Sequence, residues 1–245
     1  MTGGGDLILD ARHVDLQYGR VQILFDVSIT VERGEFVALL GTNGAGKSTF
    51  LKAVSNLSAI SAGEVWFQGE NITGLPPDVI AERGLAHIPG GRGALPDLTV
   101  DENLRLGGYL LRHDKARMAE GIEYAVDLFP WMKQRRRQLA GTLSGGEQQM
   151  LAIARALVLR PPMLMVDELS LGLAPVIVEE LMGVLARLNG EGVTILAVEQ
   201  HATLAMEAAR RVLFMEKGQV RFSGSAAEMR GRDDLLRSVF LGAGR

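Results

Sequence analysis

The chain has 245 residues, a formal net charge of -3 and a pI near 5.9. This charge gives no electrostatic reason to expect nucleic acid as the main partner. The absence of cysteine excludes disulfides, thiolate zinc sites and cysteine nucleophiles. No apolar run approaches the ~18 residues of a membrane span, and Met1–Asp6 lacks the basic and apolar regions of a secretory signal. We therefore expect a soluble cytoplasmic protein that reaches a membrane only through a partner.

The N-terminal part of the chain predicts short strands separated by turns, because apolar and polar residues partly alternate there. We expect these strands at residues 7–9, 21–25, 27–31 and 64–67. The run at 35–40 is almost continuously apolar, which is typical of a buried strand. Together these patterns indicate a small antiparallel sheet attached to an α/β core.

The middle of the chain predicts helices at 100–111 and 115–129, the second with one apolar stripe. The basic run at 135–137 indicates a solvated face rather than a site. Strands and helices then alternate, as α/β folds require. We expect helices at 147–159, 177–188 and 226–240, strands at 163–166 and 193–198, and a hairpin within 212–222. Residues 1–245 are expected to form one domain, with a helical subdomain at about 95–155.

The stretch after the buried strand matches the phosphate-binding pattern G-x-x-x-x-G-K-[ST], called the P-loop. It consists of Gly41, Thr42, Asn43, Gly44, Ala45, Gly46, Lys47, Ser48 and Thr49. An apolar strand before it and apolar residues at helical spacing after it provide the context that this motif needs. This context disfavours the alternative, a glycine-rich turn that binds nothing.

The residue types of this loop suit the phosphates of a nucleotide. Glycines let backbone N–H groups approach an anion, and a helix beginning near Gly46 adds the positive end of its dipole. Lys47 can reach the β- and γ-phosphates, and the Ser48 hydroxyl can ligate Mg²⁺. We therefore predict a nucleotide site that includes Mg²⁺.

An acidic pair, Asp167-Glu168, ends the apolar strand at 163–166. Ligand crevices in open α/β sheets lie at such carboxyl ends. We expect Asp167 to hold Mg²⁺ and Glu168 to orient a water for attack on the γ-phosphate. The alternative is two solvated carboxylates at a strand end, and the presence of the P-loop disfavours it.

Ser144, Gly145, Gly146 and Glu147 stand at the start of the helix expected at 147–159. Ser144 and Glu147 have the spacing of a capping box. A cap alone does not need two glycines, whereas close approach of N–H groups to an anion does. The P-loop, Ser144–Glu147 and the acidic pair follow one another in the order of the motifs of ATP-binding-cassette (ABC) ATPases, and they resemble those motifs. Ser144–Glu147 resembles the motif that is called the signature of the family. The resemblance covers essentially the whole chain.

The resemblance implies a RecA-like parallel-sheet core, an N-terminal antiparallel β-subdomain and an inserted α-helical subdomain. Tyr18 matches the aromatic residue that stacks on adenine, and Lys47 and Glu168 match catalytic positions. Ser144–Glu147 would contact ATP held by the P-loop of a second ATPase subunit, in a homodimer or a heterodimer. Hydrolysis of ATP would then drive transmembrane permease subunits, with the cassette peripheral on the inner face of the cell membrane.

Four further segments resemble the ATP-binding subunits of branched-chain amino acid importers, which work with a substrate-binding protein. These segments are Asn71–Pro76, Leu139–Thr142, Ser170–Pro175 and Val198–Gln200. Urea and amide importers share much of this pattern, and exporter ATPases share the core motifs, so both stay as alternatives. A non-transport ABC ATPase acting on ribosomes or DNA is disfavoured, because such proteins usually have two cassettes or long coiled-coil inserts.

Three positions depart from the common pattern of the family. Gly90 stands where most cassettes have a glutamine that meets Mg²⁺ and the membrane partner, and Leu169 replaces a proline after Glu168. Gln200 takes the place of the switch histidine, as in the branched-chain subfamily, and we expect it rather than His201 to donate to the γ-phosphate. We therefore expect hydrolysis, at a rate that these positions tune.

Overall fold

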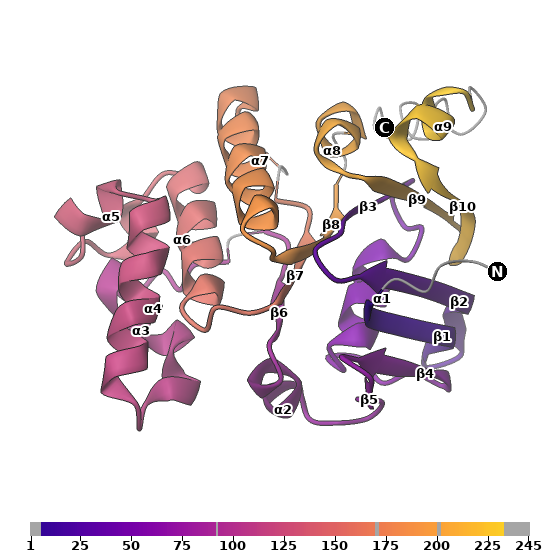
Figure 1. The fold of residues 1–245 in the computed structure, drawn as a ribbon, viewed down its shortest axis with the longest axis horizontal. Coiled ribbons are helices and arrows are strands. Elements are labelled where there is room, and N and C mark those ends of the chain that lie inside the picture. Colours follow the sequence, from indigo (N-terminus) through magenta and orange to yellow (C-terminus); the bar gives the residue numbers. More distant parts are fainter. Residues whose placement is uncertain (1–5, 92, 170–171, 200–201, 233–245) are drawn as a thin grey trace.

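The computed structural model describes residues 6–91, 93–169, 172–199 and 202–232. Figure 1 shows β-rich parts at one end of the molecule and a group of helices at the other. The described part contains two sheets, one antiparallel and one mainly parallel. The predicted class is therefore confirmed, with a parallel-sheet core, an N-terminal antiparallel sheet and inserted helices.

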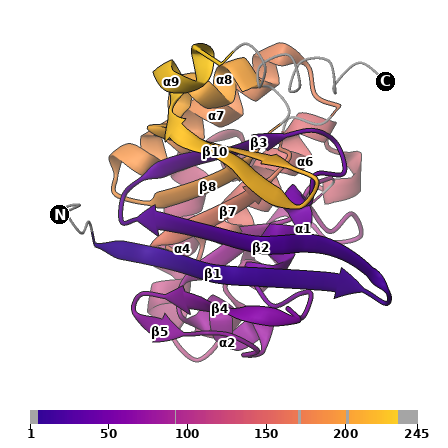
Figure 2. The ribbon, with the colours of Figure 1, turned by 90° about the vertical axis from the view of Figure 1, so that its right-hand side faces the viewer.

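The antiparallel sheet has the strand order β2-β1-β4-β5, and Figure 2 shows its strands side by side. The strands span Leu7–Tyr18 (β1), Val21–Glu32 (β2), Ala62–Phe67 (β4) and Glu70–Asn71 (β5). Both β1 and β2 are longer than the alternation predicts, because register shifts along the pair absorb the residues that break the pattern. One such residue is His13, whose φ is 51°.

The second sheet has the order β10-β9-β3-β8-β7-β6, and only its β9–β10 pair is antiparallel within the described residues. The strands span Phe36–Gly41 (β3), Leu85–Ile88 (β6), Met163–Asp167 (β7), Thr194–Val198 (β8), Arg211–Glu216 (β9) and Gln219–Ser225 (β10). In this order β8 separates β3 from β7. The P-loop and the acidic pair therefore follow the same edge of the sheet, two strands apart.

The α-helices span Lys47–Val54 (α1), Pro77–Glu82 (α2), Val100–Gly107 (α3), Lys115–Leu128 (α4), Trp131–Gln134 (α5), Gly145–Leu157 (α6), Pro175–Gly190 (α7), Ala202–Ala208 (α8) and Ala226–Arg230 (α9). Two 3₁₀ turns lie at Tyr109–Leu111 (η1) and Ala140–Thr142 (η2). The helix predicted at 100–111 thus ends at Gly107 and continues as η1. Of the helix predicted at 226–240, the part beyond residue 232 lies outside the described residues.

The parallel sheet separates two apolar clusters, because successive side chains of a strand point to opposite faces. On β3, Ala38 and Leu40 pack with α6, α7 and the helices α3 and α4. Val37 and Leu39 pack instead with α1 and the antiparallel sheet. Both faces of the sheet are covered, as a parallel sheet requires. The carboxyl ends of its strands therefore remain as the place for a ligand. No helix in the described ranges is long and apolar enough to cross a membrane.

Candidate nucleotide-binding site

The P-loop connects β3 directly to α1. Gly46 is the N-cap of α1 with φ 100°, a left-handed conformation that favours glycine. At Gly41 a Cβ would lie 2.1 Å from the carbonyl oxygen of Met215 on β9, so only glycine fits there. The turn between β9 and β10 holds the loop from the other side, since Gly218 N donates to Ala45 O at 2.9 Å. These contacts with β9 and the β9–β10 turn fix the position of the loop.

A cavity of about 420 Å³ opens over this loop. Its lining consists of Ile23, residues 43–49 and Glu168. The structure thus brings most of the predicted loop residues and the second acidic residue to one concave surface. Ile23 was not predicted, because an apolar residue in a strand carries no signal that distinguishes a cavity wall from core.

Lys47 lies inside the loop, with only 4% of its side chain exposed. Its Nζ donates to the carbonyl oxygens of Gly41 at 3.0 Å and Thr42 at 3.1 Å. Burial lowers the pKa of this ammonium group, and the nearby carboxylates of Glu168 and Asp167 oppose that effect. The lysine is thus poised beside the loop that would hold phosphate oxygens.

Ser48 and Asp167 meet across the sheet edge, where Ser48 Oγ donates to Asp167 Oδ1 at 2.9 Å. Burial raises the pKa of Asp167, the Ser48 hydrogen bond opposes this shift, and the charge of Glu168 adds to it. A buried carboxylate beside a hydroxyl is the oxygen donor set that Mg²⁺ prefers. These two residues therefore fit the predicted metal role, although the described residues contain no cluster of three or more His, Cys, Asp or Glu for a metal.

Glu168 follows β7 with φ 46°, an uncommon conformation for a residue with a side chain. Its amide N donates to Val198 O at 2.8 Å, which fixes this turn to the end of β8. Its Oε1 lies 4.0 Å from Lys47 Nζ. Strained backbone that points a carboxylate into a cavity is a common feature of functional sites.

The signature segment begins α6 and forms the predicted capping box. Glu147 N donates to Ser144 Oγ, and Ser144 N donates to Glu147 Oε2 at 2.9 Å. A Cβ on Gly146 would lie 2.6 Å from Ile177 Cγ2, whereas one on Gly145 would meet only Leu173 at 3.5 Å. Packing against α7 therefore explains Gly146, and only Gly145 is left to the argument from anion access. None of Ser144–Glu147 lines the cavity over the P-loop.

Tyr18 lies at the end of β1, 47% exposed, with its hydroxyl 3.0 Å from Ser58 Oγ. It does not line the same cavity in the described part of the chain. Its stacking on adenine stays a prediction. Gln200 and His201 lie outside the described residues, so the switch assignment also stays a prediction.

The comparison with known proteins decides the family. The sequence profile described as ABC transporter matches residues 24–170. The chain belongs to the ABC transporter family. It is therefore an ATP-binding cassette, an ATPase whose activity is coupled to transport.

Two relatives match the cassette over nearly its full length. The high-affinity branched-chain amino acid transport ATP-binding protein BraG of Pseudomonas aeruginosa is 41% identical, over 94% of this chain and 97% of that protein. The probable branched-chain amino acid transport ATP-binding protein LivF of Archaeoglobus fulgidus is 38% identical, over 86% and 89%. A solved dimer of an ATP-binding cassette in a post-hydrolysis state with ADP and phosphate superposes with a TM-score of 0.76. It is 25% identical and covers 89% of this chain and 98% of that one.

Two of the positions that depart from the family pattern can be placed in the cassette. At Gly90, which follows β6, a Cβ would lie 3.1 Å from Asp167 O and 3.8 Å from Asp167 Cγ. A side chain here would therefore lie beside the predicted metal carboxylate, and glycine removes it. Leu169 is 2% exposed and joins the apolar cluster under α6 and α7, so it serves packing in place of proline.

Proposed function

We propose that this cassette is the ATP-hydrolysing subunit of an importer for branched-chain amino acids. The observation that carries the proposal is the convergence of Lys47, Ser48, Asp167 and Glu168 at one edge of the parallel sheet. The assignment of branched-chain amino acids as the cargo is supported by the two relatives, which match most of this chain and are described as branched-chain amino acid transport ATP-binding proteins.

The P-loop would hold the triphosphate through its backbone N–H groups and Lys47. To reach the phosphates, Lys47 would exchange its hydrogen bonds to the carbonyl oxygens of Gly41 and Thr42 for bonds to phosphate oxygens. Ser48 and Asp167 would hold Mg²⁺, which when bound neutralises phosphate charge. The existing hydrogen bond between these two residues supports this role, because it already places both oxygens together.

Glu168 would orient and polarise the attacking water. Its fixed backbone and its place in the cavity lining support this role. Gln200, which follows the strand between β3 and β7, would donate to the γ-phosphate. Tyr18 would stack on adenine at the outer end of the site.

A second ATPase subunit, identical or related, would complete each site through its own Ser144–Glu147 segment. That segment does not line the P-loop cavity of its own chain, which supports this arrangement, as does the dimeric form of the solved cassette. The pair would attach to transmembrane permease subunits at the cytoplasmic face of the membrane. A substrate-binding protein would deliver the cargo on the other side.

Uptake of labelled leucine in cells tests this proposal. Deletion of the gene should abolish high-affinity leucine uptake, and the wild-type gene should restore it. The Glu168→Gln variant should fail to restore it, because an amide cannot accept the proton of the attacking water. Normal leucine uptake in the deletion strain, together with lost uptake of urea or another cargo, would contradict the assignment of branched-chain amino acids.

A further inference from the structure

A second cavity, remote from the P-loop, lies on the helical end of the molecule between α3 and α4. Its volume is about 470 Å³, within the range of about 300–1,000 Å³ that small-molecule sites occupy. Four cationic side chains contribute to its lining, and α4 supplies an apolar part. The cations are Arg105, Arg112, Lys115 and Arg136.

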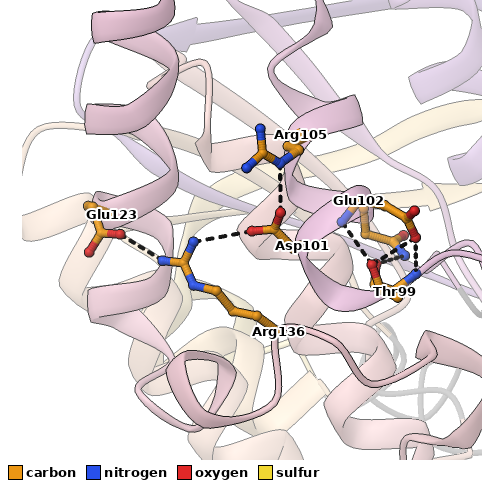
Figure 3. Close-up of polar contacts among 7 residues, drawn as sticks. Thr99, Asp101, Glu102, Arg105, Glu123 and Arg136 are labelled. Atoms are coloured by element: carbon orange, nitrogen blue, oxygen red, sulfur yellow. Dashed lines mark hydrogen bonds and ion pairs between the residues drawn. The ribbon is translucent and has the colours of Figure 1, made fainter.

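Two of these cations are held by two carboxylates. Asp101 accepts from Arg105 Nε at 2.6 Å and from Arg136 Nη1 at 3.2 Å. Arg136 Nη2 also donates to Glu123 at 2.6 Å. Figure 3 shows the Arg136 guanidinium lying between Glu123 and Asp101, with Arg105 on the other side of Asp101. This network ties α3, α4 and the segment after α5 together, so part of the basic run is structural rather than simply solvated.

The other two cations have no carboxylate partner among the described residues. Arg112 lies over the ring of Tyr109, 4.7 Å from its centroid, and donates to the Tyr109 carbonyl oxygen. Lys115 is the first residue of α4 and is exposed. The neighbouring Asp114 caps α4 through the amide of Arg117 and does not line the cavity. Among the described residues, the four cations thus have two carboxylate partners, Asp101 and Glu123, which leaves an excess of positive charge at the cavity.

The apolar part of the lining comes from α4. Met118 and Ile122 stand four residues apart, so they lie on one face of the helix, and Ile122 is 6% exposed. Apolar surface beside guanidinium and ammonium groups that have no carboxylate partner in the described residues matches a ligand that has both an anionic group and a hydrocarbon part.

We propose that this cavity binds a small organic anion. Its phosphate or carboxylate group is held by Arg112 and Lys115. Arg105, whose Nε donates to Asp101, belongs to the same lining. Its aliphatic part lies on Met118 and Ile122. Because residues of both α3 and α4 line the cavity, a ligand bound there contacts both helices. It therefore stabilises the helical end of the cassette without entering the ATP site.

Calorimetric titration with hexyl phosphate tests this site, with saturating Mg-ADP present to occupy the P-loop. We expect hexyl phosphate to bind at least about tenfold more tightly than inorganic phosphate, because its chain removes apolar surface from water. Charge reversal in the double variant Arg112→Glu, Lys115→Glu should weaken hexyl phosphate by about tenfold or more. Arg117→Glu is the matched control, since Arg117 lies in the same turn of α4 and does not line the cavity.

Equal affinity of the wild type and the double variant for hexyl phosphate would overturn the proposal. So would a wild type that binds inorganic phosphate as tightly as it binds hexyl phosphate. Thermal unfolding and ATP turnover check that the double variant is folded, since neither residue belongs to the ATP site. Sedimentation with phosphatidylglycerol vesicles separates the sources of the ligand. If the wild type sediments with the vesicles and the double variant does not, the ligand is a lipid headgroup. If the wild type binds hexyl phosphate but does not sediment with the vesicles, the ligand is a free anion.

Discussion

At the scale of single residues, a partly buried histidine links the stability of the cassette to pH. His87 on β6 accepts or donates one hydrogen bond, between Nδ1 and Ser55 Oγ at 2.9 Å, while its buried Nε2 has no hydrogen-bond partner in the described residues. Burial lowers the pKa of His87 to about 4, and the charge of Lys52 adds to the shift. The folded protein therefore keeps this ring neutral at pH values where the unfolded chain protonates it.

Stability should accordingly fall as pH drops from about 6.5 towards 4, because the unfolded state binds the additional proton. Between pH 7 and pH 5 the contribution of His87 is about 2 kcal/mol. Urea unfolding at the two pH values should show a smaller loss in His87→Gln than in the wild type. The exposed His113 provides the control variant, His113→Gln. Identical pH dependence in His87→Gln and the wild type would contradict this assignment.

Gly90 is the other residue whose effect is local and measurable. A glutamine there would place an amide beside Asp167, at the cost of a shift of a few tenths of an ångström near Asp167 O. We expect Gly90→Gln to lower the Mg²⁺ concentration for half-maximal ATPase activity by roughly fivefold, as one added hydrogen bond of about 1 kcal/mol would do. Gly90→Ala adds the crowding without the amide and should not gain affinity. A gain in both variants would contradict a role for the amide.

At the scale of elements, the start of α6 shows how one segment serves packing and function together. The capping box satisfies N–H groups at the helix start, and Arg135 pairs with Glu147 at 2.5 Å. Gly146 lets α7 pack against this turn, while Gly145 has room for a methyl group. The sequence pattern predicted the cap, but it could not assign different roles to the two glycines, because the contact with Ile177 joins elements far apart in the chain.

Alanine substitutions separate these two roles. Gly146→Ala should lower the free energy of unfolding by about 1–3 kcal/mol through overpacking against Ile177. Gly145→Ala should change it by less than about 0.5 kcal/mol. Chemical denaturation measures both. Adding Ile177→Ala to Gly146→Ala should recover part of the loss, since it removes the clashing carbon; strictly additive effects of the two substitutions would contradict the contact.

At the scale of the whole molecule, the sequence predicted the sheet core, the P-loop and the acidic pair, because each depends on residues close together in the chain. The hairpin within 212–222 was predicted. The contact of its turn at Gly218 with the P-loop and the cavity wall at Ile23 were not, since tertiary contacts alone bring these residues to the loop. The division of residues 1–245 into one domain with a helical subdomain at about 95–155 stays a prediction. So does pairing with a second cassette.

Pairing can be tested by adding negative charge where the second subunit's γ-phosphate would lie. Ser144→Asp keeps an N-cap residue but should repel the phosphate, so hydrolysis in the membrane complex should fall while the P-loop still binds ATP. Ser225→Asp is the matched control, because Ser225 forms the same capping box with Glu228 on α9. Equal ATPase activity of both variants would show that Ser144 only caps α6.

The central claim is that Glu168 turns bound ATP over at the site built by Lys47, Ser48 and Asp167. Phosphate release should be measured on the complex purified from membranes through a tag on this chain. We predict that Glu168→Gln lowers the rate by about a hundredfold or more and retains ATP binding, while Glu179→Gln on the exposed face of α7 leaves it unchanged. Wild-type turnover in Glu168→Gln, or loss of its ATP binding, would contradict the account.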